Sequence, residues 1–265
     1  DFSARINKDV TLYAVTQQAW RVQTNSQGGT PRPMQIVLNN EFAQQPEAPT
    51  KVGYTFLHWS LQKTNGAPFS FESTPITDNI MLYANWAPNS NTKYAIAYLQ
   101  ENAEDDGYTM VELVEKTGRT GDLTVYDQKS YEGFYFDRRD EDQPIEGNSS
   151  TLIKAYFKRN VYTFIVNIKN QGTNYYQELG RAEYKYGQST APLYNQAVNN
   201  YPNFGWALQQ DGDTYYSEAP KMPNNDLTIW GRYAGETEYT IQYLEKRTNI
   251  KIHDDYVFYA GNIET

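Results

Sequence analysis

One short pattern occurs three times in the chain and limits its fold more than any other feature. Residues 10–14 (VTLYA) match residues 80–84 (IMLYA) at an offset of 70, and residues 80–84 match residues 227–231 (LTIWG) at an offset of 147. Each copy follows a polar turn, and its apolar residues alternate with period two, which places them on one face of a β-strand. Self-similarity at long intervals is the signature of repeat proteins. We therefore predict small β modules in tandem.

Two further echoes set the module boundaries. Trp59 and Trp206 are also 147 residues apart, and YAIAYLQ at 94–100 matches YTIQYLE at 239–245, so a second kind of module alternates with the first. Short polar segments at 87–91 and 234–236 are suited to be linkers. The predicted modules are the tail of a repeat at 1–18, a complete module at 20–87, a module of the second kind at 92–159, a divergent module of the first kind at 161–233, and the start of another module of the second kind at 238–265.

The composition favours strands within each module. The chain has 24 Tyr among 265 residues, and Tyr-rich, β-branched sequence with regular Gly and Pro is typical of sheets. In the first complete module we expect strands at 20–25, 34–39, 53–60 and 79–86. The prolines of segment 42–50 exclude a long helix there, and Asn65-Gly66 is a strong hairpin signal. In the second kind of module we expect strands at 94–100, 108–118, 123–127, 133–139 and 151–159.

Charge and composition exclude several classes of protein. The net charge of −9 and the pI of about 4.8 disfavour nucleic acid as a partner, because an acidic chain repels phosphates. No apolar run approaches the roughly 20 residues that span a bilayer, so we expect no membrane insertion. Cysteine is absent, which excludes disulfides and Cys-based metal sites. The first residue is Asp1 and no signal peptide is evident, so we expect a mature or excised piece.

Four segments carry a resemblance to a known family. They are NSQGG at 25–29, PTKVGYTFLHW at 49–59, FSFESTPITDNIMLYANW at 69–86 and KMPNNDLTIW at 221–230. Through them the first kind of module resembles the Listeria–Bacteroides repeat, the B repeat of internalin-type bacterial surface proteins. The copy at 161–233 departs from the pattern, because no Gly-Tyr-Thr-Phe precedes Phe204. The second kind of module is similar to mucin-binding-type modules of Gram-positive surface proteins, through segments 94–108, 129–134 and 147–160.

The resemblance implies a mainly β fold of small α+β, β-grasp-like modules that form an elongated tandem row. It implies an extracellular location, at the cell surface or cell wall of a Gram-positive bacterium or secreted from it. Modules of these families act as spacers or adhesive units. They carry no catalytic residues to transfer, so the resemblance implies no enzyme.

The residues themselves also give no positive sign of catalysis, metal binding or a cofactor. His58 and His253 lie in different modules, and a catalytic base needs a partner within hydrogen-bond reach. Acidic clusters at 104–106, 137–142 and 211–213 lack the ligand spacing of a calcium loop, so we interpret them as charged surface loops. We predict no catalytic, cofactor-binding or metal-binding residue.

Aromatic residues are the remaining candidates for a site. Phe56, Trp59, Trp86, Trp206 and Trp230 recur within the repeat, which favours packing in a core. Six tyrosines of the divergent module lack counterparts in the first one: Tyr175, Tyr176, Tyr184, Tyr186, Tyr215 and Tyr216. Exposed Tyr rings can stack on sugars, because each ring has an apolar face and a polar tip. Paired surface strands rich in Tyr are the other interpretation.

Three functions follow from this pattern. The first is a non-catalytic part of a bacterial surface or secreted repeat protein, acting as a stalk or spacer, with adhesion to a host surface protein or glycan and with neighbouring repeats as its other partners. The alternative is a lectin-like module that binds carbohydrate through the tyrosines of 175–216. A hydrolase with a site between two modules is a third, but it needs two carboxylates at a defined separation, and the sequence identifies no such pair.

Overall fold

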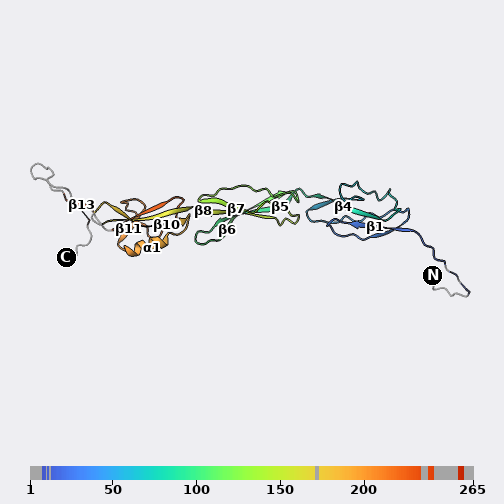
Figure 1. Cartoon of the computed structure of the whole chain (residues 1–265), viewed down its shortest axis with the longest axis horizontal. Helices are drawn as coiled ribbons and strands as arrows, with labels where there is room; N and C mark the ends of the chain where they lie inside the picture. The colour runs from blue at the N-terminus through green and yellow to red at the C-terminus, as the bar shows by residue number, and fades with distance from the viewer. Residues whose placement is uncertain are drawn as a thin grey trace, which may run out of the picture. The chain divides into compact units, whose positions relative to one another are not determined.

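The computed structural model describes residues 8–9, 11, 13–170, 173–233, 238–241 and 256–259 (Figure 1). Strands dominate the described residues, with one helix among them. The chain forms two compact units. Unit 1 comprises Asp1–Ile96, Val114–Tyr126 and Glu141–Ile153, and unit 2 comprises Ala97–Leu113, Asp127–Asp140 and Lys154–Thr265. Each unit contains one complete four-stranded sheet, and each contributes residues to a further four-stranded sheet within 92–159.

The complete sheet of unit 1 has the strand order β2-β1-β4-β3. Its strands are β1 (Ala19–Asn25), β2 (Gln35–Leu38), β3 (Tyr54–Ser60) and β4 (Ile80–Pro88). The first and last strands run parallel in the centre, and the outer strands pair antiparallel to them. The turn between β1 and β2 uses Gly28 at φ +88°, a conformation that glycine adopts without strain. The four strands predicted for this module are confirmed.

The core of this sheet lies on one of its faces. Val22, Trp59 and Leu82 point into it from the strands, and Ala43 and Ile76 reach it from the connecting segments. Trp59 is 1% exposed and Leu82 is fully buried, which confirms that they are core residues. Burial of a side chain such as Leu82 stabilises the fold by about 1.5–3 kcal/mol. No helix forms over 42–50, as the prolines predict.

The sheet within 92–159 has the strand order β6-β5-β8-β7. Its strands are β5 (Thr92–Glu101), β6 (Tyr108–Gly118), β7 (Phe134–Arg139) and β8 (Leu152–Arg159). The strand predicted at 123–127 is wrong. The backbone of Val125 is hydrogen bonded on both sides to the hydroxyl of Tyr94 instead of to a neighbouring strand, and only Leu123 forms an isolated bridge, with Pro144.

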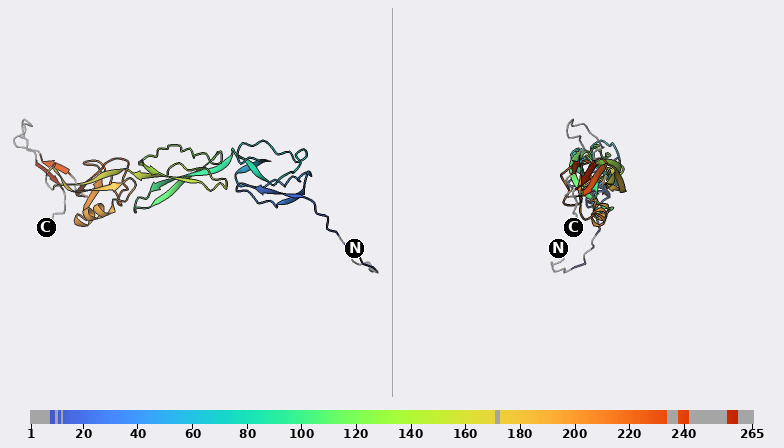
Figure 2. Two further views of the ribbon diagram at one scale, coloured as in Figure 1. Left: turned by 45° about the vertical axis from the view of Figure 1, so that its right-hand side comes forward. Right: turned by 90° about the vertical axis from the view of Figure 1, so that its left-hand side faces the viewer.

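The complete sheet of unit 2 repeats the order of the first, as β10-β9-β12-β11, with β9 and β12 parallel. Its strands are β9 (Val161–Lys169), β10 (Tyr176–Lys185), β11 (Phe204–Ala207) and β12 (Leu227–Tyr233). The helix α1 (Ala191–Asn200) lies against one face of this sheet (Figures 1 and 2). Trp206 is 2% exposed and Ile229 is fully buried, which confirms the predicted match with Trp59 and Leu82.

Helix α1 was not predicted from the sequence. Its proline, Pro192, lies in the first turn, where the missing N–H costs nothing. Tyr194 and Ala197 are three residues apart, so they share the face that packs on the sheet, and both are buried. Residues 42–50 occupy the same place in the order of elements of the first sheet, but they form no helix.

Other expectations need correction or lie outside the described residues. Asn65-Gly66 does not form a two-residue hairpin. It belongs to the longer connection 61–79, where Asn65 has φ +54°. Near the C-terminus, β13 (Glu238–Ile241) pairs antiparallel with β14 (Tyr256–Tyr259). Linker 234–236, His253 and half of the residues of 1–18 are outside the described residues.

Candidate functional site

Three of the six candidate tyrosines are packed into unit 2. Tyr184 is 7% exposed and its ring meets Phe164 edge-on, so it offers no ring face to a ligand. Tyr186 is half-buried. Tyr176 is also half-buried, and its hydroxyl donates a 2.9 Å hydrogen bond to Asp211 Oδ1. Burial, together with the charge of Asp211, raises the pKa of the Tyr176 hydroxyl above its usual value.

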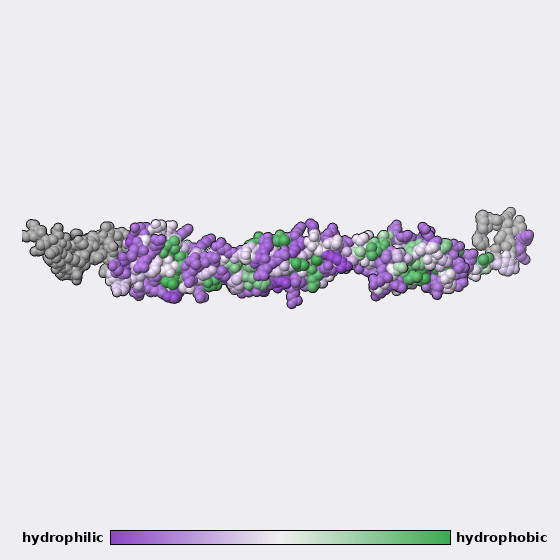
Figure 3. Space-filling view, turned by 90° about the horizontal axis from the view of Figure 1, so that it is seen from above, coloured by the Kyte–Doolittle hydropathy of each residue, from purple (hydrophilic) through white to green (hydrophobic). Residues whose placement is uncertain are grey.

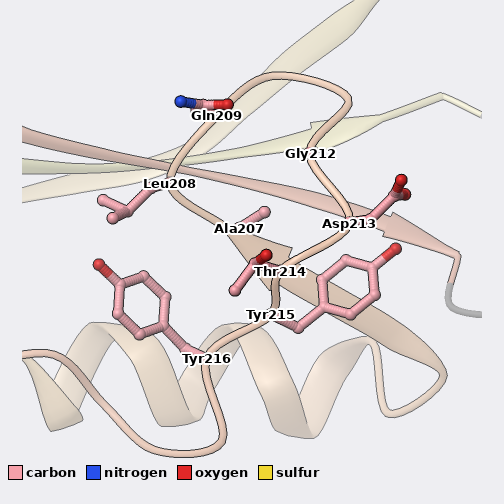
Figure 4. Close-up of a pocket in the computed structure, with 8 residues that line it drawn as sticks. All are labelled: Ala207, Leu208, Gln209, Gly212, Asp213, Thr214, Tyr215 and Tyr216. Atoms are coloured by element: carbon pink, nitrogen blue, oxygen red, sulfur yellow. The ribbon is translucent and has the colours of Figure 1, made fainter.

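Of the other three tyrosines, Tyr175 and Tyr215 are exposed, whereas Tyr216 is half-buried and packs against the core of unit 2. Tyr175 is 77% exposed. Tyr215 and Tyr216 line a hollow of about 260 Å³ formed by residues 207–216 (Figure 4). The structure therefore does not gather the six tyrosines into one platform, but it brings two of them to the same concave surface.

The histidine and acidic candidates have local structural partners. His58 Nε2 is 2.9 Å from the carbonyl oxygen of Gly66 and is hydrogen bonded to it. Glu104 accepts a 2.9 Å hydrogen bond from the backbone N–H of Ser189, and Asp105 accepts one of 2.7 Å from that of Gly107. Across the described ranges, no three His, Asp or Glu side chains are grouped so that they could hold a metal ion.

A junction held by backbone hydrogen bonds follows β4 within unit 1 and leads to the next sheet. The N–H of Asn89 donates to the carbonyl of Gly53 over 2.9 Å, and the carbonyl of Asn89 accepts from the N–H of Thr120 over 2.8 Å. Gly53 has φ +79°, and a Cβ placed on it would lie 2.2 Å from Cα of Gly147. Only glycine satisfies both this backbone conformation and this close approach.

Unit 2 contains a second junction with the same hydrogen bonds. Asn160 is the one residue between β8 and β9. Its N–H donates to the carbonyl of Gly133 over 2.9 Å, and its carbonyl accepts from the N–H of Tyr186 over 2.8 Å. Gly133 has φ +77°, and a Cβ on it would lie 2.1 Å from the Tyr186 ring. Both junctions use a Gly-aromatic step, at 53–54 and at 133–134, and the sequence alone does not show that these steps form junctions.

Charged side chains reinforce the second junction. Arg159 Nε donates to the carbonyl of Glu101 over 2.7 Å, and Arg159 Nη1 donates to the carbonyl of Tyr186 over 2.6 Å. Lys185 Nζ lies 2.9 Å from Glu101 Oε1, and this contact, ahead of the one to Asp106, raises the pKa of Lys185 above its usual value. The Glu101 side chain is only 11% exposed, so the ion pair with Lys185 is shielded from solvent.

The hollow of residues 207–216 is shaped by a loop that folds back over the end of β11. In Figure 4, Leu208 and Tyr216 lie on one side, Asp213 and Tyr215 lie on the other, and Thr214 lies between them. Leu208 is 56% exposed and Tyr215 is 36% exposed. The face of the molecule shown in Figure 3 is mainly polar, and its apolar residues form small separate groups.

The first sheet has a hollow at the matching place, of about 290 Å³, lined by residues of the 61–74 segment. Leu61 and Gln62 correspond to Leu208 and Gln209, again at an offset of 147. The loops are anchored alike, because Phe69 N–H donates to the carbonyl of Trp59 over 2.7 Å and Tyr216 N–H donates to that of Trp206 over 2.8 Å. The hollow is thus a feature of the repeat.

Comparison with known proteins identifies the repeat type. Residues 21–85, which contain most of the first sheet and its hollow, match the family model of the Listeria-Bacteroides repeat domain. This is the class that the sequence resemblance predicted for the first module, and it is confirmed there.

Two individual relatives extend the likeness. The chain is 24% identical over 286 aligned residues to a protein of Evansella cellulosilytica named "Putative membrane protein", covering 97% of this chain and 40% of that protein. It is 43% identical over 54 residues to Internalin H of Listeria monocytogenes, covering 20% of this chain and 10% of Internalin H. The chain thus spans less than half the length of either relative. The described part contains no helix that is long and apolar enough to cross a membrane. Together the matches indicate a surface repeat protein.

Proposed function

We propose that this chain is a non-catalytic stalk segment of an extracellular protein on the cell wall or surface of a Gram-positive bacterium. The observation that carries the proposal is the junction that occurs twice. A flexible linker would leave successive sheets free to rotate, whereas each junction fixes one Asn by hydrogen bonds on both sides. A spacer needs this property, because it must hold its neighbours at a distance.

Three finer statements belong to the same proposal. The sheets are β-grasp-like modules, since each complete sheet has parallel first and last strands in its centre. Residues 92–159 are a mucin-binding-type module, and the modules follow one another in an elongated row. The described residues with a resolved pKa shift are explained by local ion pairs, hydrogen bonds and burial, so none of them needs a catalytic role.

Small-angle scattering of the whole chain tests the stalk directly. A compact globule of this length would have a radius of gyration of about 18 Å. Three to four modules in line, each about 26 Å long, would reach roughly 90 Å and give a radius of gyration of about 27 Å. We expect the larger value, and a value near 18 Å would overturn the proposal.

Tryptic cleavage after Arg159 tests the rigidity of the second junction. Gly133→Ala should open it, because the new Cβ meets the Tyr186 ring and a positive φ is unfavourable for Ala. We expect cleavage at Arg159 to become about tenfold faster or more, since a loss of about 1.4 kcal/mol raises the open population tenfold.

Gly121→Ala is the matched control for this experiment. Gly121 also has a positive φ, of +86°, but a Cβ on it would meet only the Tyr54 hydroxyl, at 4.0 Å. This variant introduces similar backbone strain without the clash. If both variants leave cleavage at Arg159 unchanged, the junction does not restrain the chain and the stalk loses its physical basis.

Adhesion is a second candidate function. The sequence predicts a host surface protein or a glycan as partner, and the tyrosine-lined hollow favours the glycan, because Tyr presents an apolar ring face together with a polar tip. A glycan array probed with the whole chain tests this function. If no glycan binds, glycan adhesion is excluded and the stalk remains as the proposed function.

A further inference from the structure

We propose that the hollow formed by residues 207–216 binds one neutral pyranose residue of a glycan, and that the matching hollow of the first sheet does not. The inference specifies the site and ligand of the proposed glycan adhesion, and it is independent of the stalk. It starts from the comparison of two hollows that share their position, their Leu-Gln pair and their anchoring hydrogen bond.

The walls of the two hollows differ in the residues that a sugar would touch. Counting back from the shared anchor, Gly66, Ala67 and Pro68 of the first loop are replaced by Asp213, Thr214 and Tyr215, and the anchor itself changes from Phe69 to Tyr216. Each replacement adds a group that can hydrogen bond to a hydroxyl, and one of them, Tyr215 in place of Pro68, also adds an aromatic ring. The replacements on the shared scaffold thus all make the wall of the hollow more able to hydrogen bond.

The new side chains are held in place before any ligand arrives. Arg232 Nε donates a 2.8 Å hydrogen bond to the Tyr215 hydroxyl, and its guanidinium also pairs with Asp213. The Tyr215 ring packs directly on Gly205, where a Cβ would lie 2.4 Å from the ring. On the other side, the carbonyl of Tyr216 accepts a 3.2 Å hydrogen bond from the Tyr194 hydroxyl of α1. A wall that is already ordered loses less entropy on binding.

The first sheet lacks this bracing. The residue that corresponds to Arg232 is Asn85, at an offset of 147, and its side chain donates to Ser60 Oγ over 2.8 Å. It therefore holds the end of β3 and not a wall of the hollow. The same backbone position supports a strand in one repeat and orders a tyrosine in the other.

The chemistry of the hollow fits a neutral pyranose better than an ion or a peptide. A pyranose has one apolar face and a rim of hydroxyls, and here Leu208 and Tyr216 lie opposite Asp213 and Tyr215 (Figure 4). Arg232 compensates the charge of Asp213, so the wall favours neither a cation nor an anion. The volume of about 260 Å³ lies below the range of drug-sized pockets, which suits one sugar ring and excludes a folded partner.

The test is saturation-transfer NMR on the whole chain with the methyl glycosides of glucose, galactose, mannose and N-acetylglucosamine. We expect saturable binding of at least one of the four. Tyr215→Ala and Leu208→Ala should each weaken it about tenfold, which corresponds to about 1.4 kcal/mol. Leu61→Ala, the matched change in the other hollow, should leave it unchanged.

Each outcome decides the proposal. Leu208 is more than half exposed, so Leu208→Ala keeps the fold even if Tyr215→Ala disturbs its loop, and circular dichroism checks both variants. Binding that survives both variants, or that is lost equally with Leu61→Ala, would overturn this site and leave glycan adhesion to be located elsewhere. If no glycoside binds while a glycan array is positive, the single-pyranose site falls; if the array is also negative, glycan adhesion falls with it.

Discussion

The sheets of β1–β4 and β9–β12 are two versions of one design, and the parts that they share define what the repeat requires. Both place the first and last strands parallel in the centre. Both have one buried Trp on the outer strand next to that pair, Trp59 on β3 and Trp206 on β11. In both, the side chain just before the last strand accepts a 2.8 Å hydrogen bond from the backbone of the first strand, from Arg21 to Asn79 and from Thr163 to Asp226.

The two sheets differ in everything that surrounds this centre. The second is covered by α1 where the first has the proline-broken segment 42–50. Strand β3 has a bulge at Leu57, which is 55% exposed, whereas β11 pairs with β12 in a regular register. The comparison teaches that the inward face is fixed by packing, whereas covers, bulges and loops are free to change and so to acquire a function.

The largest expected effect comes from removing the shared Trp. Trp59→Ala and Trp206→Ala should each lower the free energy of unfolding of their own sheet by about 3–5 kcal/mol, because each leaves a large cavity. Urea denaturation followed by circular dichroism measures this loss. Leu57→Ala is the control, and it should change the free energy by less than about 0.5 kcal/mol. A small effect for either Trp would show that the two cores are not equivalent.

The next largest effect comes from the residue that lies opposite each Trp, which differs between the two sheets. Trp59 lies opposite Ala84, and Trp206 lies opposite Gly231. A Cβ on Gly231 would lie 2.3 Å from the Trp206 ring, so Gly231→Ala should destabilise unit 2 by about 1–3 kcal/mol through overpacking. Gly180→Ala is a milder case, since its Cβ would be 3.3 Å from Leu193. Equal melting temperatures of the two variants would contradict a tighter second core.

A matched pair of glycine substitutions compares the two covers. Gln196→Gly, on the exposed side of α1, should cost about 1 kcal/mol because glycine is a poor helix former. Gln45→Gly, in the segment that replaces the helix in the first sheet, should cost much less, since that backbone is not helical. Thermal unfolding of both variants provides the measurement, and equal losses would mean that α1 is not a stabilising cover.

The smallest effect concerns acid. A hydrogen bond from Lys169, ahead of one from Tyr176, holds the pKa of Asp211 below its usual value. A carboxyl whose pKa is lower in the folded protein contributes stability above its unfolded pKa of about 3.9, and that contribution is lost as the pH falls through the folded value. Asp211→Asn should therefore destabilise unit 2 slightly at neutral pH, and the difference from the unaltered protein should disappear on acidification below about pH 4.

Denaturation of both proteins at a series of pH values tests this sign. Glu72→Gln, at an exposed carboxyl of unit 1, is the control. A difference that grows on acidification would contradict the ion pair between Lys169 and Asp211.

The features that could be predicted from the sequence are those that follow from alternating apolar residues and from the repeat. The strands around Trp59 and Leu82 follow from period-two patterning, and the match to Trp206 and Ile229 follows from the constant offset. Prediction from the sequence failed where an alternating pattern can form either a strand or a loop. Residues 123–127 alternate like a strand, but the Tyr94 hydroxyl hydrogen bonds to both the N–H and the carbonyl of Val125 in the middle of the segment. A contact of this kind joins residues that are about thirty positions apart, so no local propensity reveals it.

The candidate site was predictable only in part. Tyr215 and Tyr216 were singled out because the first module lacks them, and the structure places both at one hollow. Tyr184 has the same sequence signal but is buried, because its place in β10 turns it toward α1. Arg232 was missed, since its role depends on a loop that returns to β12 from nineteen residues earlier in the chain.

The parallel central pair has a mechanical consequence. Because β1 and β4 run side by side in the same direction, the chain enters the sheet at one end of this pair and leaves it at the other end, and β9 and β12 do the same. A pull along the chain therefore loads all the hydrogen bonds between the two strands at once, in shear, and cannot break them one at a time as it would in a hairpin pulled open from its ends. Each of these sheets is therefore arranged to resist tension that is applied through its two ends.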